Sequence, residues 1–283
     1  MKNGRSSSPS TLLTLCFMLV FALASCGRGN SQASSSQKQQ KQTQESPQKS
    51  ALAAVEESLD KAEIPSSDLT VIKQRIEASP DRFFDLLTKV EARAKEDPYL
   101  LKRVDKKKSL PQDYEPGDLV LLDKTGLSVS RPGHRLRKPA YEALVLMSEA
   151  ARKEGISLLV SSAYRSYAYQ VEVFARNVKE MGQKEAERVS AHPGASQHQL
   201  GTAIDFGSIT DAFAQTKASA WLVKNAATYG FSLSYPKGME PITGYVWESW
   251  HYRYIGTDAT ALQDEYFLGV QCYLIQFLDA RLS

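Results

Sequence analysis

The chain has 283 residues, of which 42% are hydrophobic and 24% are charged. This balance excludes a wholly disordered chain, a collagen-like fibre and a membrane protein with many spans. The formal net charge is only +3, and Lys2 and Arg5 supply two of the positive charges, so no general basic excess indicates a nucleic-acid partner.

The N-terminus has the organisation of a signal peptide. Lys2 and Arg5 precede an apolar run, Thr11–Ala24, which as a helix would span about 21 Å, less than the roughly 30 Å of a bilayer core. The run leads into Leu-Ala-Ser-Cys ending at Cys26, which resembles a bacterial lipobox. We therefore expect a lipoprotein signal peptide over residues 1–25. A lipid on Cys26 would anchor the protein to the membrane of the bacterial cell envelope, outside the cytoplasm. The alternative is an ordinary signal peptide in which Cys26 stands by chance.

Residues 26–50 are predicted to be a flexible linker. They are rich in serine and glutamine and contain no large apolar side chain, so they cannot bury a core. Their root-mean-square reach is about 27 Å for a flexible chain. Removal of Cys16 and acylation of Cys26 would leave only Cys272, so no intramolecular disulfide is possible in the mature chain. We expect Cys272 to be buried in an apolar helical stretch.

The segment 51–108 is predicted to be helical. We expect one helix over 51–62, a second over 66–78 and a third that begins at Ser79-Pro80-Asp81. The third helix carries apolar residues at helical spacing, namely Phe83, Phe84, Leu86, Leu87 and Val90. No catalytic constellation is visible here, which favours a helical support layer. A partner-binding module is the alternative.

Residues 109–283 are predicted to form a domain of helices and short strands. Strands are expected in the run that follows Pro116-Gly117 and over 156–163, 202–206 and 252–255. Helices are expected over 139–154, 167–181 and 219–229, with a last one from 258 to 282. No regular strand-helix-strand repeat occurs, which indicates the α+β class.

Two of the four histidines lie in stretches dense with other functional residue types. His198 precedes Asp205, and Glu248 stands three residues before His251. Two neutral imidazoles and one carboxylate leave an open position on a tetrahedral zinc ion, which is typical of a catalytic site. Glu248 could then accept the proton of a water molecule on the metal. If residues 251–254 form a strand, His251 and Arg253 point to one face, which places Arg253 behind the metal or in a surface ion pair.

The other two histidines are interpreted as loop residues rather than metal ligands. His192 precedes Pro193-Gly194 and is expected in a loop that leads into the site, and His134 is expected to be exposed in a loop.

The motifs resemble those of a known family. Residues 196–205 have the pattern Ser-x-His-x-x-Gly-x-Ala-x-Asp, residues 248–251 have Glu-x-x-His, and Tyr164-Arg165-Ser166 is followed by Gln170. Together they resemble the zinc D-alanyl-D-alanine carboxypeptidases of the VanY type, which are related to the dipeptidase VanX. The resemblance covers about residues 109–257. Many family members have glutamate where this chain has Gln197.

The resemblance implies a small antiparallel sheet with flanking helices and a single zinc site. It assigns the metal ligands to His198, Asp205 and His251. It makes Glu248 the general base and Arg165 the group that stabilises the oxyanion. It places Ser196 and Gln170 in contact with the substrate.

The implied function is a zinc-dependent removal of the terminal D-alanine of peptidoglycan stem peptides, by attack of metal-bound water. One alternative is an L,D-carboxypeptidase that acts on tetrapeptide stems, since it needs the same motifs. Another is a zinc module that binds wall peptides without cleaving them. The presence of Glu248 and Arg165 argues against the last, because a pure binder needs neither.

The C-terminal segment carries a wide apolar face. Its members recur at helical spacing and are Tyr266, Val270, Tyr273, Leu274, Phe277 and Leu278. We expect this face to pack against the apolar stripe Phe83–Val90 and so form a support layer beside the zinc domain. In the alternative, each stripe packs separately on the catalytic core.

Overall fold

The computed structural model describes residues 47–123 and 126–283, all of which belong to one compact unit. The predicted signal peptide 1–25, the lipidation site Cys26 and the linker up to residue 46 lie outside the described residues. Within the described ranges, no helix is both long enough and apolar enough to cross a membrane.

The N-terminal segment is helical, as predicted. It contains α1 (Pro47–Lys61), α2 (Ser66–Ala78) and α3 (Pro80–Glu96). Helix α1 begins within the last residues that the sequence assigned to the linker. Proline suits the first turn of a helix because its fixed φ is already helical and its missing N–H is not needed there. The Ala-rich stretch behind it favours helix as well.

The second part of the unit is built on a five-stranded sheet with the order β2-β4-β5-β7-β6. The strands are β2 (Ser128–Val129), β4 (Leu159–Ser162), β5 (Ala203–Phe206), β6 (Phe231–Leu233) and β7 (His251–Tyr254). All neighbours are antiparallel except the edge strand β2 and β4, which pair in parallel, so the predicted small antiparallel sheet is confirmed with one parallel pair at its edge. A separate antiparallel ribbon joins β1 (Leu119–Leu121) to β3 (Arg135–Arg137).

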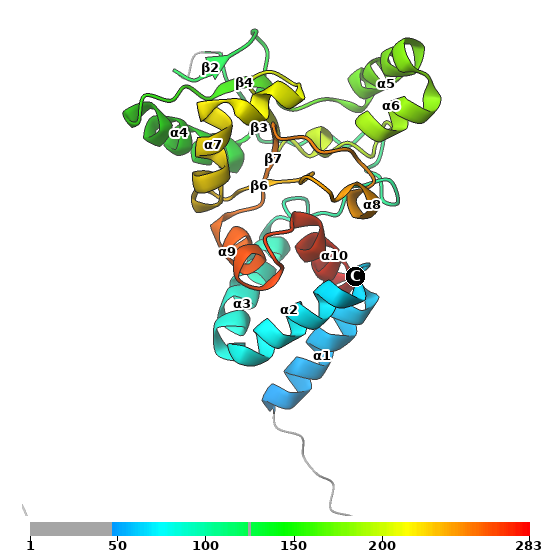
Figure 1. The fold of residues 1–283 in the computed structure, drawn as a ribbon, viewed down its shortest axis with the longest axis vertical. Coiled ribbons are helices and arrows are strands. Elements are labelled where there is room, and N and C mark those ends of the chain that lie inside the picture. Colours follow the sequence, from blue (N-terminus) through cyan, green and yellow to red (C-terminus); the bar gives the residue numbers. More distant parts are fainter. Residues whose placement is uncertain (1–46, 124–125) are drawn as a thin grey trace, which may run out of the picture. The chain divides into compact units, whose positions relative to one another are not determined.

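Helices flank the sheet on several sides (Figure 1). They are α4 (Lys138–Lys153), α5 (Tyr167–Met181), α6 (Gln183–Val189), α7 (Lys217–Asn225) and α8 (Glu240–Thr243), with short 3₁₀ helices η1 (Gln197–Leu200), η2 (Asp211–Gln215) and η3 (Ala226–Tyr229). The α+β class expected from the sequence is confirmed. Helix α5 has the predicted bounds, and its first turn is capped by Ser166, whose hydroxyl accepts a hydrogen bond from the Tyr169 N–H.

The expected C-terminal helix is two helices, α9 (Thr257–Tyr266) and α10 (Gln271–Leu282). The break lies at Leu268 and Gly269, which have φ values of 59° and 71°. Leu268 in this left-handed region is unusual for a residue with a side chain, and Gly269 tolerates it freely. The side chain of Gln263 donates to the Gly269 carbonyl and holds the turn.

The apolar face of the C-terminal helices packs on the N-terminal helices, which confirms the predicted support layer. The ring of Phe83 lies 5.1 Å from that of Tyr266 and 6.4 Å from that of Phe277, measured between centroids. All three belong to one buried cluster formed by α1–α3, α9 and α10. Figure 1 shows these five helices together on one side of the sheet. Cys272 is half-buried at the edge of this cluster rather than fully enclosed.

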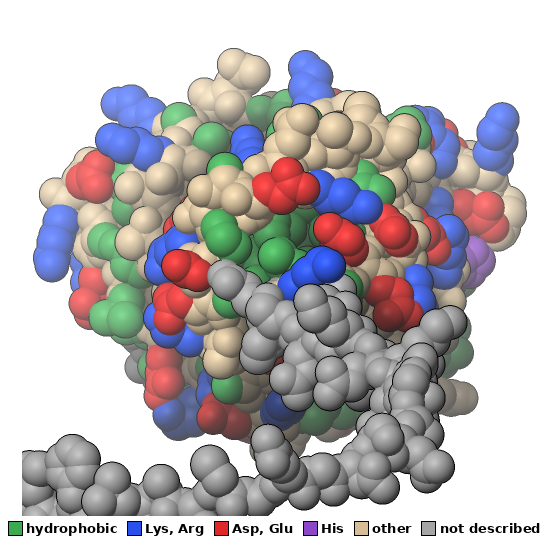
Figure 2. Space-filling view, turned by 90° about the horizontal axis from the view of Figure 1, so that it is seen from below, with side chains coloured by type: hydrophobic (Ala, Val, Ile, Leu, Met, Phe, Trp, Pro, Cys, Tyr) green, Lys and Arg blue, Asp and Glu red, His purple; other side chains and the backbone are tan. Residues whose placement is uncertain are grey.

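The free end of this helical layer carries interspersed charges of both signs (Figure 2). Several are paired: Lys73 lies 2.8 Å from Asp60, and Arg82 lies 2.8 Å from Glu265 of α9. A second buried cluster lies between the sheet and helices α4 and α7. The site described next sits on the sheet.

Candidate functional site

Two strands and one 3₁₀ helix bring the three predicted metal ligands together. Asp205 of β5 pairs directly with His251 of β7 in the antiparallel register, so both side chains project from the same face of the sheet. His198 comes from η1, which leads into β5 through Gly201. Gly201 has φ of 73°, and a Cβ atom there would lie 2.8 Å from Cγ of Arg137. Only glycine therefore suits both the turn and the close packing at this position.

The side chains form a compact, buried group. Nε2 of His198 lies 3.1 Å from Oδ2 of Asp205, and Nδ1 of His251 lies 2.9 Å from Oδ1 of the same carboxylate. One donor atom from each of the three residues lies within 4.8 Å of the others. Three ligands on one zinc ion, each about 2.0–2.2 Å from it, would lie within such a separation. The donor set of two imidazoles and a carboxylate fits a zinc ion that keeps an open position.

The far nitrogen of each imidazole is held by an oxygen atom. Nδ1 of His198 lies 2.7 Å from the Ala163 carbonyl, and Nε2 of His251 lies 3.2 Å from Oε1 of Gln197. Both oxygens can accept a hydrogen from these nitrogens. With a metal bound, Nε2 of His198 and Nδ1 of His251 would offer their lone pairs to the ion, and without a metal a proton on either atom donates to Asp205.

Gln197 is connected in turn to the C-terminal helix. The Ser234 hydroxyl lies 2.7 Å from Oε1 of Gln197 and 3.1 Å from Oε1 of Gln271 in α10. A buried polar chain therefore runs from the metal site to a helix outside the motifs.

Burial and charge shift the pKa values of the carboxyl groups in opposite directions. Burial of Asp205 disfavours its ionisation, but attraction and hydrogen bonds from His198 and His251 outweigh this and hold its pKa well below the usual range. Burial raises the pKa of Glu248 to about 7, against the attraction of His251. Oε2 of Glu248 lies 3.6 Å from Nδ1 of His251. The two carboxyl groups are thus suited to different tasks, one as a permanent anion and one as a group that exchanges a proton.

Arg165 follows β4 and is fixed by neutral side chains. Its Nη1 donates to Oε1 of Gln170 at 2.8 Å, and its Nη2 donates to the Ser162 hydroxyl at 3.1 Å. Gln170 is itself buried and donates to the Ala191 carbonyl. Gln170 is not among the residues at the wall of the cleft described below; it orients Arg165, and its contact with substrate stays a prediction.

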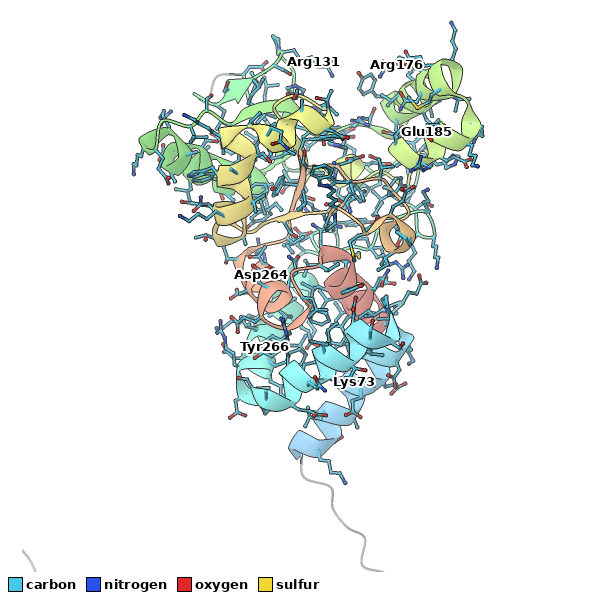
Figure 3. All side chains as sticks on the ribbon, viewed as in Figure 1. Lys73, Arg131, Arg176, Glu185, Asp264 and Tyr266 are labelled. Atoms are coloured by element: carbon cyan, nitrogen blue, oxygen red, sulfur yellow. The ribbon has the colours of Figure 1, made fainter. Side chains whose placement is uncertain are left out.

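The site opens into a cleft of about 710 Å³. The predicted residues at its walls are Arg165, Ser196, His198, Asp205, Glu248 and His251. The Ser196 hydroxyl also accepts a hydrogen bond from the His198 N–H and so caps η1. Helices α5 and α6 line the cleft with Arg176 and Glu185, which are labelled in Figure 3.

The sequence did not indicate several other cleft residues. Arg176, Glu185 and Arg188 are spaced along amphipathic helices where charge normally means a solvated face, and Tyr235 and Tyr245 lie in irregular chain. The ring of Tyr235 lies 5.0 Å from that of His251, between centroids. Only the tertiary structure places these residues beside the metal site.

The remaining two histidines lie away from the metal-binding group. His134 is buried, which corrects the expectation of an exposed residue. Its backbone carbonyl accepts from the Leu122 N–H at the end of the β1–β3 ribbon, and its ring lies 3.3 Å from the Ser130 hydroxyl. His192 packs on Phe174, with ring centroids 4.3 Å apart.

Comparison with known proteins agrees with this geometry. The family model described as VanY, D-alanyl-D-alanine carboxypeptidase, matches residues 133–257. YodJ of Bacillus subtilis (strain 168) is 40% identical over 173 residues, which is 58% of this chain and 63% of YodJ. The chain covers between 45% and 63% of the length of the first three curated relatives that it matches.

Two solved structures are also similar. One is the LdcB LD-carboxypeptidase, with a TM-score of 0.55 and 39% identity, covering 60% of this chain and 86% of that one. The other is a vancomycin resistance D,D-pentapeptidase VanY in complex with Zn(II), with a TM-score of 0.53 and 30% identity, covering 64% of this chain and 99% of that one. The fold, the arrangement of the site and these similarities agree, and the chain belongs to the VanY family of D-alanyl-D-alanine carboxypeptidases.

Proposed function

We propose that this protein is a zinc-dependent carboxypeptidase that removes a terminal D-alanine from peptidoglycan stem peptides. The observation that carries the proposal is the buried group of His198, Asp205 and His251, which shares one cleft with Glu248 and Arg165. The first three residues would hold the metal. When bound, zinc supplies a Lewis acid that polarises a carbonyl and lowers the pKa of water.

Glu248 is suited to move the proton. Its side chain is 14% exposed and opens on the cleft, so its carboxylate can take a proton from the attacking water and give it to the departing amine. Because burial raises its pKa to about 7, neither transfer is strongly uphill near neutral pH.

Arg165 is suited to stabilise the oxygen that becomes negative when the carbonyl is attacked. A guanidinium stays charged at all relevant pH values and cannot compete for the proton. Its contacts with Gln170 and Ser162 hold the guanidinium group in place before substrate binds. Electrostatic stabilisation of a transition state requires such a charge to be positioned in advance. Ser196 is a substrate contact in this proposal, because its hydroxyl lies at the cleft and has a hydrogen to donate.

The second candidate is L,D-carboxypeptidase activity on tetrapeptide stems. It is favoured by the similarity to the LdcB LD-carboxypeptidase, at 39% identity. A zinc module that only binds wall peptides is disfavoured, because such a module has no use for a proton-transfer group and a fixed guanidinium in the same cleft.

The test is incubation of the purified full chain with pentapeptide and tetrapeptide stems, followed by mass spectrometry with and without a zinc chelator. We expect loss of one alanine from the pentapeptide, abolished by the chelator and restored by zinc. Loss from the tetrapeptide alone would establish the second candidate. Binding of both stems without cleavage at full zinc content would refute both.

We also propose that Cys26 is lipidated and anchors the protein to the cell envelope. The support is the sequence around Cys26 and the Ser/Gln-rich stretch behind it. Cys26→Ala should abolish labelling by a lipid precursor and release the protein from the membrane fraction. Cys16→Ala is the matched control and should keep both. An unmodified Cys26 in envelope-derived protein would contradict the proposal.

A further inference from the structure

We propose that Arg176 and Asp211 recognise a substrate side chain that ends in both a carboxylate and an ammonium group. Both residues line the cleft. They would select stem peptides whose diamino residue has this end over peptides in which it ends in an ammonium group alone. The proposal rests on the proposed function and names the substrate class for the same cleft.

Most charged side chains of the cleft already have a partner or a task. The charged residues at its walls are Arg165, Arg176, Glu185, Arg188, Asp205, Asp211 and Glu248. Both carboxylate oxygens of Glu185 accept from Nη1 of Arg188, at 2.8 and 3.1 Å. The same guanidinium donates to Glu240 of α8 at 2.6 and 2.8 Å. Three of the others belong to the metal site and its chemistry, which leaves one cation and one anion.

Arg176 and Asp211 are this remaining pair of charges. Within the part of the chain that the structure describes, no oppositely charged side chain lies within 4.0 Å of either residue, and neither side chain takes part in a hydrogen bond. Each charge is therefore free to attract a ligand. Because the two are not paired with each other, a group that carries both signs can bind between them, with its carboxylate on Arg176 and its ammonium on Asp211.

Both residues lie on walls that continue from the metal site. Arg176 is on α5 (Figure 3), and the buried Val173, three residues earlier, also lines the cleft, so this face of the helix is turned inward. Asp211 begins η2, which follows β5 and is fixed by the buried Phe213. Burial, and to a smaller extent the charge of Arg176, lowers the pKa of Arg165, which indicates that Arg176 stands near the reacting end of the cleft.

The cleft also suits the carbon chain of such a substrate side chain. Met181 and Ile209 line it and are 42% and 49% exposed, so they offer apolar surface to methylene groups. A volume of about 710 Å³ is in the range of sites that enclose a whole small ligand, which leaves room beyond the terminal alanine. A diamino residue one or two positions before that alanine begins within about 7 Å of it, because an extended peptide advances about 3.3–3.6 Å per residue.

The test compares three stem peptides that differ only in the end of the diamino side chain. The first ends in carboxylate and ammonium (meso-diaminopimelate), the second in the corresponding carboxamide and ammonium, and the third in ammonium alone (lysine). With the full zinc-loaded chain, kcat/KM should be about tenfold higher for the first peptide, between the effects of an exposed and a buried ion pair. Equal values for the three would overturn the proposal and leave the proposed function intact.

Two variants assign the two charges. Arg176→Gln should raise KM about tenfold for the first peptide alone and so abolish the preference. Asp211→Asn should raise KM for all three, since all carry the ammonium group. Arg152→Gln, at an exposed arginine of α4 outside the cleft, is the control and should change none of the values.

Two results with these variants would contradict the assignment. An equal loss on all three peptides in Arg176→Gln would place Arg176 at the terminal carboxylate, which the peptides share, and the proposal would fall. Unchanged KM values in Asp211→Asn would overturn the recognition of the ammonium group.

Binding to zinc-loaded Glu248→Gln separates recognition from reaction. Calorimetry should give a dissociation constant about tenfold lower for the first peptide than for its carboxamide. This difference in binding, together with no cleavage of any peptide by the wild type, would refute the proposed function and support the recognition. Equal dissociation constants would overturn the recognition at any rate of turnover.

Discussion

The helical layer and the sheet domain bury different kinds of residue. The layer formed by α1–α3, α9 and α10 encloses an aliphatic and aromatic cluster, and the hydroxyl groups of Tyr266 and Tyr273 in it are satisfied by Ser79 and Asp68. The sheet domain has an apolar core too, but it also buries the imidazoles and carboxylate of the metal site.

Because of this difference, the helical layer should contribute mainly to folding stability and the buried polar site mainly to catalysis. Apolar burial contributes to folding wherever it occurs, whereas buried charges are costly and persist only where partners compensate for them. We therefore expect variants of the layer to change the free energy of unfolding and variants of the site to change turnover or zinc affinity. The two regions meet at Arg253 and Gln271, so variants at these two positions should change both the free energy of unfolding and the properties of the site.

Glu248→Gln should have the largest effect, and it should be confined to the chemistry. Loss of a positioned proton-transfer group lowers turnover by about 10²–10⁴-fold. The zinc content and the melting temperature should stay near those of the wild type, because the amide keeps the shape of the side chain. Steady-state kinetics with metal analysis measures this, and Glu187→Gln on the exposed face of α6 is the control. Turnover near wild type at full zinc content would assign the proton transfer to another residue.

Phe277→Ala should lower the stability of the fold and leave the chemistry unchanged. Removal of a buried aromatic ring from the layer costs about 3–5 kcal/mol of unfolding free energy. Denaturant titration measures this cost, and activity per folded molecule should be unchanged. Leu282→Ala, at a position that is 45% exposed, is the control and should change stability by less than about 0.5 kcal/mol. A parallel loss of zinc from folded Phe277→Ala protein would contradict the separation of the two regions.

Gln197→Leu probes the contact that fixes the His251 ring. Loss of the oxygen that accepts from Nε2 should weaken zinc affinity about 10–100-fold, the usual effect of removing a hydrogen bond behind a metal ligand. Competition with a chromophoric chelator measures the affinity. Gln199→Leu is the matched control: its amide donates to the Pro111 and Tyr114 carbonyls, so it should lower stability and leave zinc affinity unchanged. Equal zinc affinity in both variants would show that Gln197 does not support the metal ligand His251.

Tyr266→Phe should have the smallest effect. It removes the hydroxyl that donates to the Ser79 carbonyl at 2.9 Å and keeps the ring, so about 1 kcal/mol of stability should be lost. Thermal and denaturant melts measure the change. Altered turnover in this variant would indicate that the helical layer influences the metal site through contacts other than those of Gln271.

The sequence by itself determined the elements and the site residues that depend on near neighbours. The bounds of α5 follow from the Ser166 cap and the periodicity behind it, because both operate within a few residues. The grouping of His198 with Asp205 follows from a short motif with one turn at Gly201. The resemblance added His251, Glu248 and Arg165, whose residue types already specify the chemistry that a zinc peptidase needs.

Other features depended on chain segments that meet only in the folded state. The parallel pairing joins β2 to β4, which are far apart in the sequence, so no local pattern predicts it. The break at Leu268 is stabilised by Gln263 from the preceding helix. The burial of His134 follows from its place at the end of the β1–β3 ribbon.

Tertiary structure also decided what each buried polar side chain does. The resemblance matched Gln170 to a substrate contact, and the structure adds that its side chain holds Arg165. Arg253 was equally compatible with a surface ion pair, yet it is enclosed by carbonyls of Leu100 and Lys102, far from it in the chain. The physical reason is that residue type specifies which hydrogen bonds and charges a side chain can offer. Which partners and how much water it meets depend on packing between distant segments.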